Sequence, residues 1–461
     1  MVSLTAQTLC EIIHGQWICG PADRVLSGVV GTDSRKVSAE MAFFALGGER
    51  FDGNLFAPQA SQLGAAVVVV SSIPEGIDDS CAVILVPDVL VALQTLAEWW
   101  RARLETLEVV GITGSSGKTS TKDLTLSVLA QKFRATATLG NLNNHIGVPL
   151  SVLKAESSDE AAIWEMGMNH AGELAPLCRI TQPRIGLISS IGSAHIEFLG
   201  TRDAIAVEKC TLARCLPPDG AVIYPLDCDY AELIESSTVA KCIGVGIGKT
   251  GKGVVRAEDV ILTDEGSSFR LLIDEFCDEV VHLPLHGEHM VSNALLAAAA
   301  GWVLGLSSDQ IIRGLENVSL TGGRLKCERR NGILVLDDTY NANPESMKAA
   351  LQTLSAIDCQ GKRWAVLGKM GELGAHSLEA HREVGRLALE SRVHVLISVG
   401  SEARSITEGI PGNEGKIRLH FDTREEAANY LKYHVGQGDA ILFKGSRSAG
   451  MEQVISLTFN N

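Results

Sequence analysis

The chain has 461 residues, a length that suggests about three domains rather than one core. Its 55 acidic residues outnumber its 40 basic ones, and the formal net charge of −15 argues against nucleic acid as the main partner, because nucleic acid favours a basic face. The charge does not exclude a small anionic substrate held by a local basic cluster. The 11 cysteines are scattered without a C-x-x-C pair, which indicates reduced thiols and offers no ligand spacing for zinc.

No segment favours export or membrane insertion. The stretch 1–15 lacks the basic and apolar regions of a signal peptide. The longest low-polarity stretch, "ALLAAAAGWVLGL" from Ala294, is shorter than the roughly 20 residues that cross a bilayer. We therefore expect a cytoplasmic protein in which this stretch forms a buried helix.

Residues 1–106 are expected to form the first domain. Short apolar runs rich in β-branched residues predict strands at 41–46, 65–70 and 82–86. Apolar residues at helical spacing from residue 89 predict the helix that ends this domain.

Residues 107–318 are expected to form the second domain. It opens with the strand-like run "LEVVGIT", followed by a glycine-bearing loop and a helix over 119–132. Further elements are predicted as buried strands at 161–167 and 184–192 and as an alanine-rich helix at 290–305.

Residues 319–461 are expected to form a third domain in which strands and helices alternate. Continuous apolar strands separated by helices predict a parallel sheet that is covered on both faces. The predicted strands are 332–338, 363–368, 394–400, 416–421 and 439–445.

The loop "GITGSSGKTSTK" follows the first strand of the second domain. A strict phosphate-binding loop, G-x-x-x-x-G-K-[ST], would need glycine at position 112, where this chain has Ile112. A strand, a glycine turn and a helix N-terminus nevertheless direct backbone N–H groups toward one point, and the helix dipole favours an anion there. An ordinary strand–helix turn is the alternative interpretation.

The side chains of this loop suit a nucleotide. Gly114 and Gly117 permit a tight backbone path, and Lys118 supplies a charge for the β- and γ-phosphates. The hydroxyl of Thr119 can bind Mg²⁺.

The string T-G-S-S-G-K-T-S resembles the variant loop T-G-[TS]-x-G-K-T-[TS] of the Mur ligases and of the related folylpolyglutamate synthase, which use ATP to join a carboxylate to an amine. The resemblance implies an ATP site. Its loop residues would be Thr113, Gly114, Ser115, Ser116, Gly117, Lys118, Thr119 and Ser120.

Other stretches resemble the branch of the Mur ligases that adds D-alanyl-D-alanine. The most specific is "DDTYNANPESMKAAL" at 337–351, and two stretches near the start, 32–37 and 45–54, resemble nucleotide-sugar-binding segments. The remaining matches are 140–153, 165–174, 287–299, 367–374 and 444–451.

The implied chemistry brings two anions together, a carboxylate and the γ-phosphate of ATP, so cations are needed where they meet. The resemblance implies two Mg²⁺ ions, with Thr119 and Glu165 among their ligands and His195 as a ligand of the second. It also implies that Lys209 is carbamylated and that Lys118, His195 and Lys209 are catalytic.

This chain departs from the family around Lys209, where K-G-E-I is usual. Cys210 replaces the glycine and Thr211 replaces the glutamate. The position of the lysine still fits, and a solvated lysine is the alternative.

Residues for the rest of the nucleotide follow from the resemblance. His289 and Asn293 lie four apart, on one face of a helix, and are implied at the base and the metal–phosphate edge. Arg324 is implied to contact the phosphates when the third domain closes. Asp338 is implied to bind the ribose. It ends a predicted strand, and ligands commonly bind at the carboxyl ends of strands in such sheets.

Ser34 and Arg35 resemble the family's uridine-diphosphate contacts, and the planar fork of an arginine suits a diphosphate. Asn143 and Asn144 hold either the peptide or their own loop, and the sequence does not separate these roles.

Three further positions differ from common family residues. Asn54 stands where histidine is common, Ser190 where asparagine is frequent, and Lys369 where aspartate is common.

Together the resemblance implies an α/β protein of three domains: an N-terminal α/β substrate domain, a central P-loop-type ATPase domain with a mostly parallel sheet, and a C-terminal Rossmann-like α/β domain. It implies a monomeric ligase that joins D-alanyl-D-alanine to UDP-N-acetylmuramoyl-tripeptide, whose third peptide residue, diaminopimelate or lysine, stays open. A sister ligase adding one amino acid is the near alternative, although its Asp-Asn-Pro-Arg stretch is absent. A regulatory P-loop NTPase is the alternative from another class.

Overall fold

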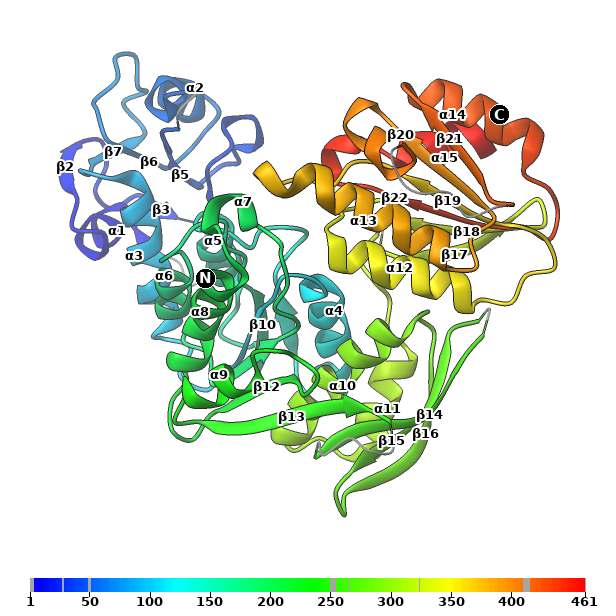
Figure 1. Cartoon of the computed structure of the whole chain (residues 1–461). Helices are drawn as coiled ribbons and strands as arrows, with labels where there is room; N and C mark the ends of the chain where they lie inside the picture. The colour runs from blue at the N-terminus through cyan, green and yellow to red at the C-terminus, as the bar shows by residue number, and fades with distance from the viewer. Residues whose placement is uncertain are drawn as a thin grey trace. The chain divides into compact units, whose positions relative to one another are not determined.

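The computed structural model describes residues 4–26, 29–48, 51–248, 254–263, 265–322, 324–408 and 415–460. Within them, helices and strands alternate along the chain and build four sheets, of which the three larger are mostly parallel (Figure 1). The predicted α/β fold class is therefore confirmed. No helix in these ranges is long and apolar enough to cross a membrane.

The chain folds into two compact units within the described ranges. One unit comprises Met1–Gly111, Phe133–Gly167 and Glu173–Arg184. The other comprises Ile112–Lys132, Met168–Gly172 and Ile185–Asn461. The domain limits at residues 106 and 318 stay a prediction.

The first unit contains a five-stranded sheet in the order β2-β7-β6-β5-β4, antiparallel at β2–β7 and otherwise parallel. Its strands are β2 (Gln16–Cys19), β4 (Val30–Gly31), β5 (Ala42–Phe44), β6 (Val67–Val70) and β7 (Ala82–Leu85). The three predicted strands are β5, β6 and β7, whose residues are buried almost throughout. Beside this sheet lie β1 (Leu4–Thr5) with β3 (Val25–Leu26), α1 (Ala6–Ile12), η1 (Ser34–Lys36), η2 (Gly53–Phe56) and α2 (Ala57–Gln62).

Helix α3 (Val89–Arg101), predicted from its apolar spacing, contacts later segments of the chain that belong to the same unit. Trp100 is buried, and its indole Nε1 donates to the carbonyl of Ala155 at 2.9 Å. The buried Arg101 guanidinium donates to the carbonyl of Thr181 at 3.0 Å. The segments held in this way are α5 (Gly147–Lys154) and α6 (Leu174–Thr181), and the same unit contains β9 (Ala135–Ala137) and β10 (Ala161–Glu165).

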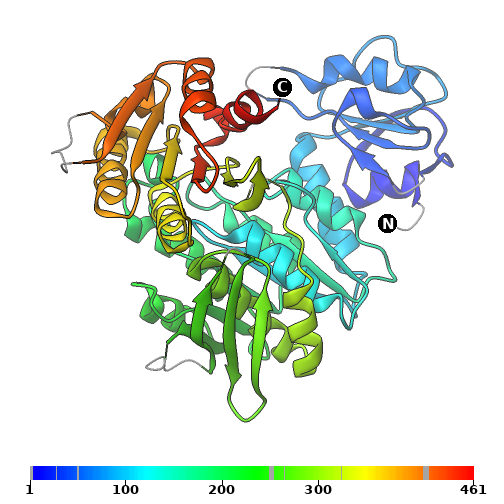
Figure 2. The same cartoon turned by 90° about the vertical axis from the view of Figure 1, so that its right-hand side faces the viewer.

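The largest sheet has nine strands in the order β16-β15-β14-β13-β12-β11-β8-β10-β9, and the chain passes from one unit to the other within β8 (Glu108–Thr113). From β11 to β14 the pairing is parallel, whereas β14, β15 and β16 pair antiparallel and form an arm at one edge (Figure 2). These strands are β11 (Ile185–Ile188), β12 (Ala221–Pro225), β13 (Lys241–Ile247), β14 (Val255–Leu262), β15 (Ser267–Ile273) and β16 (Cys277–Leu283).

The predicted alanine-rich helix is α10 (Glu288–Val303), and its core residues are fully buried. It packs against α4 (Lys118–Leu129), the helix that follows the glycine loop. At Gly301 an added Cβ would lie 2.7 Å from a methyl of Val128, so small residues permit this close approach. The other helices of this region are α7 (Ile196–Leu199), α8 (Arg202–Arg214), α9 (Ala231–Ser236) and α11 (Ser308–Glu316).

The C-terminal sheet has six strands in the order β17-β18-β22-β19-β20-β21. The five predicted strands are parallel, as expected, and the sequence interpretation missed only β17, which pairs antiparallel with β18. Its strands are β17 (Lys326–Arg330), β18 (Ile333–Asp338), β19 (Arg363–Leu367), β20 (Val395–Val399), β21 (Ile417–Phe421) and β22 (Ala440–Lys444).

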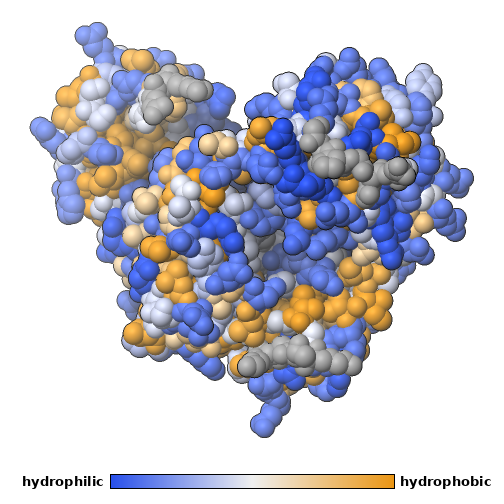
Figure 3. Space-filling model, in the orientation of Figure 1, coloured by the Kyte–Doolittle hydropathy of each residue, from blue (hydrophilic) through white to orange (hydrophobic). Residues whose placement is uncertain are grey.

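Helices cover both faces of this sheet. The pair α12 (Pro344–Ala356) and α13 (Ser377–Glu390) lies on one face, and α14 (Arg424–His434) with α15 (Glu452–Phe459) lies on the other (Figure 1). The surface over α13 is mostly hydrophilic (Figure 3). Because the strands are parallel, their carboxyl ends share one edge, where Asp338 and Lys444 lie. Short 3-10 turns complete the region at η3 (Gly374–His376), η4 (Ser401–Ile406) and η5 (Arg447–Ala449).

Candidate functional site

The glycine loop joins β8 to α4 as predicted. Gly117 has a positive φ of 82° at the helix N-cap. A Cβ on Gly114 would lie only 2.0 Å from Ser189 Oγ, so this position also requires glycine. The ammonium of Lys118 donates to the carbonyl of Gly114 at 2.6 Å, which folds the side chain back over the loop.

Two serines after β11 hold the loop in shape. Ser115 N donates to the Ser190 carbonyl at 2.9 Å, and Ser116 N donates to Ser190 Oγ at 2.8 Å. Ser189 Oγ donates to the Ser116 carbonyl at 2.5 Å, and Gly192 N donates to Ser115 Oγ at 2.9 Å. Sequence reasoning singled out Ser190 only as a departure from the family, yet its hydroxyl forms part of the loop's support.

Asn293 on α10 lies directly against this loop. Its Oδ1 accepts a hydrogen bond from Thr121 Oγ1 at 3.2 Å. An added Cβ at Gly117 would lie 2.8 Å from the same oxygen. The structure therefore brings Asn293 to the glycine loop, and its place at the metal–phosphate edge of the nucleotide stays a prediction.

His289 lies one turn before Asn293 on α10. Burial lowers the pKa of His289 to about 4; nearby Asp338 acts to raise it and Lys444 to lower it. The imidazole is therefore neutral at physiological pH, with one ring nitrogen able to accept a hydrogen bond. These interactions also place His289 near the carboxyl ends of β18 and β22.

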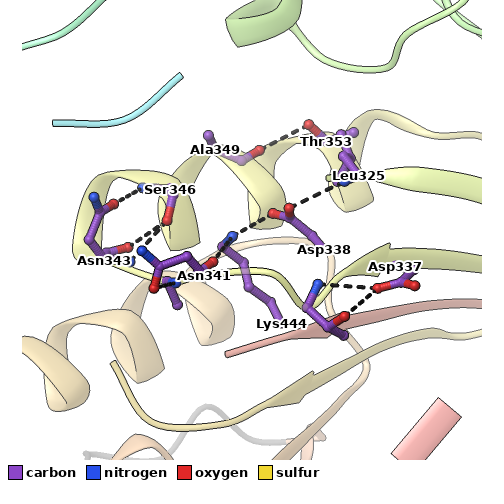
Figure 4. Close-up of polar contacts among 11 residues, drawn as sticks. Leu325, Asp337, Asp338, Asn341, Asn343, Ser346, Ala349, Thr353 and Lys444 are labelled. Atoms are coloured by element: carbon purple, nitrogen blue, oxygen red, sulfur yellow. Dashed lines mark hydrogen bonds and ion pairs between the residues drawn. The ribbon is translucent and has the colours of Figure 1, made fainter. Parts of the chain in front are cut away.

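Asp338, predicted as a ligand-binding residue, accepts hydrogen bonds from two residues in a polar cluster at the carboxyl end of β18 (Figure 4). Its Oδ2 accepts from Lys444 Nζ at 2.5 Å, and its Oδ1 accepts from Leu325 N at 3.2 Å. Lys444 is 2 % exposed and also donates to the carbonyl of Asn341 at 2.9 Å. The sequence analysis quoted the segment that contains Lys444 but did not single out this residue.

Arg324 packs against an aromatic ring. Its guanidinium carbon lies 4.0 Å from the centroid of the Tyr340 ring, a cation–π contact. The buried Nε of Arg324 has no hydrogen-bond partner among the described residues. The Nε–H donor of the Arg324 guanidinium is thus available to an anion.

The N-terminus of α12 meets the glycine loop and the loop after β11. Asn343 caps the helix by accepting from Ser346 N at 2.9 Å (Figure 4). The same side chain donates from Nδ2 to the carbonyl of Ser115 at 3.2 Å. Glu345 Oε1 accepts from Ser193 N at 2.7 Å. Neither contact was predicted from the sequence.

His195 faces a carboxylate from the third expected domain. Its Nδ1 lies 2.6 Å from Glu372 Oε2, and the hydrogen bond to His195 holds the pKa of Glu372 below its usual range. Both residues have positive φ, 68° and 60°. Strained backbone of this kind gathers at functional sites.

Lys209 is buried within α8 and is 1 % exposed. Burial lowers its pKa well below the usual value, nearby Lys118 lowers it further, and Glu208 acts in the opposite direction. Burial therefore favours the neutral amine of Lys209 over the charged ammonium, and the side chain lies in the core rather than in solvent. The altered neighbour Cys210 is buried as well.

In the first unit, Glu165 ends β10 and is 2 % exposed. Its Oε1 accepts from Asn143 Nδ2 at 2.7 Å. Asn144 Oδ1 accepts from the backbone N–H groups of Ile146 at 3.1 Å and Gly147 at 2.8 Å. The bonds of Asn144 are therefore local to its own loop, whereas Asn143 links that loop to Glu165.

Ser34 and Arg35 open the turn η1 in the first unit. The exposed Arg35 guanidinium donates to both carboxylate oxygens of Asp33, at 2.8 and 2.9 Å. These bonds lower the pKa of Asp33 to about 2. Of the nucleotide-sugar segment 45–54, residues 49–50 lie outside the described residues.

Asn54, which replaces a histidine common in the family, is a structural residue. Its side chain is 6 % exposed and bonds Asp52, Ser71 and the backbone of Ser72. Sequence reasoning could not anticipate that this position fixes a turn.

A cavity of about 360 Å³ lies at the carboxyl ends of β20 and β21, within the C-terminal region. Lys369, which replaces a common aspartate, lines it and pairs with Glu402. The remaining lining residues include Gly400, Ser401, Asp422, Thr423, Arg424 and Glu425. Acidic and basic groups therefore face the same small space.

The described residues hold no ready group of three His, Cys, Asp or Glu side chains that could bind a metal ion by itself. Mg²⁺ prefers oxygen ligands and is commonly shared between side-chain oxygens and a bound phosphate. The hydroxyl of Thr119, at the start of α4, fits such a shared site.

Comparison with known proteins identifies related enzymes over the whole chain. The Mur ligase family catalytic domain matches residues 28–99, the Mur ligase middle domain matches 112–301, and the Mur ligase glutamate ligase domain matches 323–447. The UDP-N-acetylmuramoyl-tripeptide--D-alanyl-D-alanine ligase of Bacillus subtilis (strain 168) is 34% identical over 457 residues, which cover 99% of this chain and 98% of that protein. The chain belongs to the Mur ligase family.

Further Mur ligases match over nearly the whole length. The ligase of the same name from Escherichia coli (strain K12) is 35% identical over 458 residues, covering 99% of this chain and 98% of the relative. A crystal structure of MurF from Acinetobacter baumannii superposes with a TM-score of 0.90 at 34% identity and covers 100% of both chains. MurF of Thermotoga maritima in complex with ADP has a TM-score of 0.83 at 28% identity, covering 93% of this chain and 96% of that one.

Proposed function

We propose that this Mur ligase joins D-alanyl-D-alanine to UDP-N-acetylmuramoyl-tripeptide in the cytoplasm, as a monomer, with conversion of ATP to ADP and phosphate. The observation that carries the proposal is the full-length similarity to ligases of that name, together with a glycine loop whose charge and shape suit nucleotide phosphates. The related structure that holds ADP supports the choice of nucleotide.

The nucleotide would lie along the glycine loop. The backbone N–H groups at the start of α4 and the ammonium of Lys118 would bind the phosphates. Neutral His289 and Asn293 would lie at the base and at the phosphate edge, and Asp338 would bind the ribose. Arg324 would offer its unpartnered Nε to the phosphates.

Mg²⁺, when bound, would neutralise charge on the phosphates and bring the carboxylate of the substrate close to them. The residues proposed to hold it are Thr119, Glu165, His195 and a carbamylated Lys209. Lys209 suits carbamylation because only a neutral amine attacks CO₂, and burial lowers the pKa of this amine, which favours its neutral form. The reaction forms an N–C bond, releases one proton and leaves an anionic oxygen ligand beside the positive Lys118.

In the reaction, a carboxylate oxygen of the tripeptide would attack the γ-phosphorus, and ADP would leave. The amine of the dipeptide would then attack the acyl carbon, phosphate would leave, and one proton would be lost. Lys118 and Arg324 would stabilise the negative charge that develops on the transferred phosphoryl group.

The uridine diphosphate and D-alanyl-D-alanine are proposed to bind segments that are far apart in the sequence. Ser34 and Arg35 would contact the uridine diphosphate. The Arg35 guanidinium would then give up its hydrogen bonds to Asp33 and donate to the phosphate oxygens instead. The cavity lined by Lys369 and Arg424 would take D-alanyl-D-alanine, because its mixed charges suit a zwitterion and ligands favour the carboxyl ends of parallel strands.

ADP release in the presence and absence of each substrate tests the proposal. We expect release only when both D-alanyl-D-alanine and UDP-N-acetylmuramoyl-tripeptide are present, with the joined pentapeptide as product. Release that requires a single amino acid would indicate a sister ligase. Release that is independent of every peptide would indicate a regulatory NTPase. Tripeptides with diaminopimelate or lysine at position three would define the preferred substrate.

The role of Lys209 has its own test. Lys209→Ala should be inactive, and acetate should partly restore turnover, because a small carboxylate can replace the lost anionic oxygen. Lys348→Ala, which removes an exposed lysine on α12, is the matched control and should keep wild-type activity. Full activity of Lys209→Ala would exclude the carbamate.

A further inference from the structure

Helix α4 carries two buried charged residues to which the proposed function gives no role. Lys122 and Asp123 have side chains that are 4% and 6% exposed, and Lys122 Nζ lies 2.9 Å from Asp123 Oδ1. Burying an ion pair costs desolvation energy that mutual attraction does not fully offset. Such a pair is therefore a weak source of stability, and its other contacts indicate what it does.

The other contacts of Asp123 are to a residue far along the chain. Thr321 N donates to Asp123 Oδ2 at 2.8 Å, and Thr321 Oγ1 donates to Asp123 Oδ1 at 3.1 Å. Thr321 is itself exposed and lies in the linker between α11 and β17. Hydrogen bonds to a carboxylate are the stronger kind, so this linker residue is held firmly to α4.

The linker is held again on its far side. Leu325 N donates to Asp338 Oδ1 at 3.2 Å (Figure 4). Leu325 is buried and adopts a positive φ of 48°. Arg324 lies between these two anchored positions, with its guanidinium 4.0 Å from the Tyr340 ring. The two carboxylates, Asp123 and Asp338, thus bind Thr321 and Leu325, which lie on either side of Arg324 in the sequence.

We propose that Asp123 is a positioning residue for phosphoryl transfer: by tying Thr321 to α4, it sets the point from which Arg324 reaches the nucleotide phosphates. This inference rests on the proposed function, because it assumes that Arg324 contacts those phosphates. Asp123 is five residues after Lys118, about 7.5 Å along the helix axis at about 1.5 Å per residue. The helix that follows the phosphate loop therefore also holds Thr321 of the linker.

Charge neutralisation explains the partner of Asp123. An isolated buried carboxylate would favour its protonated form and would then accept hydrogen bonds less strongly. The ammonium of Lys122, on the preceding position, lies 2.9 Å from Asp123 Oδ1 and offsets the charge of the buried carboxylate, whose two oxygens accept from Thr321.

The mildest test is Thr321→Val, which removes the hydroxyl at an exposed position and keeps the size and charge of the side chain. Thr263→Val is the matched control, since Thr263 is also exposed and its Oγ1 accepts from Glu265 N at 3.2 Å, on the β14–β15 connection. We expect Thr321→Val to lower kcat about threefold or more and the control to leave it unchanged. Asp123→Asn should lower kcat by about tenfold or more.

A double-mutant cycle with Arg324→Ala separates positioning from general destabilisation. If Asp123 acts through Arg324, Thr321→Val and Asp123→Asn should each change kcat by less than about twofold in the Arg324→Ala background. The thermal midpoint of unfolding of each variant shows whether the assayed protein is folded. Because Arg324→Ala is expected to turn over slowly, its product is measured after long incubations.

Two results would overturn the inference. One is wild-type kcat in both Thr321→Val and Asp123→Asn. The other is the same fold-loss with and without Arg324, which would mean that the anchor only stabilises the protein. A wild-type enzyme that fails to ligate the two substrates would instead remove the proposed function, and this inference with it.

Discussion

Three non-glycine residues of the candidate site adopt the left-handed region: His195, Leu325 and Glu372, with φ of 68°, 48° and 60°. Each such conformation costs on the order of 1–3 kcal/mol and persists only where surrounding contacts offset it. The contacts are visible here, since His195 lies 2.6 Å from Glu372 and Leu325 N bonds Asp338. The folded protein therefore maintains strain where the proposed chemistry takes place.

Gly117→Ala should weaken nucleotide binding more than it weakens the fold. Gly117 has φ of 82°, and an added Cβ would meet Asn293 Oδ1 at 2.8 Å. Alanine there would push Asn293 away from the phosphate loop. We expect the KM for ATP to rise by about tenfold, equivalent to roughly 1.4 kcal/mol, in steady-state assays.

Gly76→Ala is the matched control for this substitution. Its φ of 80° is nearly the same, but nothing lies within 4 Å of the added Cβ. Both variants should lose about 1 kcal/mol of stability from backbone strain. Equal KM values in the two variants would refute a role for the Gly117–Asn293 contact.

At the scale of elements, the sequence predicted the strands that are buried throughout. The apolar runs at β6, β19, β20 and β22 are continuous because both faces of a parallel sheet are covered. The arm of β14, β15 and β16 was not predicted, because its burial alternates and charged residues interrupt each run. Its antiparallel pairing depends on contacts between strands that no single run reveals.

The same limit applies to helix α12. Asn343 followed by Pro344 is a recognisable helix start, so the cap could be predicted from the sequence. The hydrogen bond from Asn343 to Ser115 could not, because it joins residues 228 positions apart. The bonds of Ser190 to the glycine loop escaped prediction for the same reason.

Asn343→Asp should separate the two roles of this side chain. Aspartate caps helices as well as asparagine does, so the thermal midpoint should stay near that of the wild type. The carboxylate cannot donate to the Ser115 carbonyl and would repel it. We expect kcat/KM for ATP to fall by about fivefold to tenfold, which corresponds to one lost hydrogen bond of about 1 kcal/mol.

Asn343→Ala removes both the cap and the donor. It should lower the thermal midpoint as well as kcat/KM, since a lost cap costs about 1 kcal/mol. If Asn343→Asp loses stability to the same extent as Asn343→Ala while its activity is normal, the contact with the loop has no catalytic role.

At the scale of the whole molecule, the net charge of −15 conceals a local balance at the site. Lys118 and Lys444 come from segments far apart in the sequence, and Lys444 is paired with Asp338. The family motifs identified most of these positions, but not the burial that lowers the pKa of Lys209 and of His289. Burial depends on the packing of α8 and α10, which composition does not determine.

The neutral state of His289 gives the fold a specific dependence on pH. Burial lowers its pKa from the usual 6.5 to about 4 in the folded protein. Between these values the unfolded chain binds a proton that the folded chain does not, so stability rises with pH across this window. The stabilisation is fully present above pH 6.5 and is lost as pH falls toward 4, by at most about 1.4 kcal/mol per pH unit.

His289→Gln should remove this dependence, because glutamine does not titrate. We expect the difference in thermal midpoint between wild type and variant to be constant above pH 7 and to shift in favour of the variant as pH falls from 6.5 to 4. Asp338 and Lys444 face His289 in both proteins, and their contributions largely cancel in the difference. Parallel midpoint curves for the two proteins from pH 8 to pH 4 would mean that His289 is accessible to protons in the folded state, and its assignment as a neutral partner for the nucleotide base would then fail.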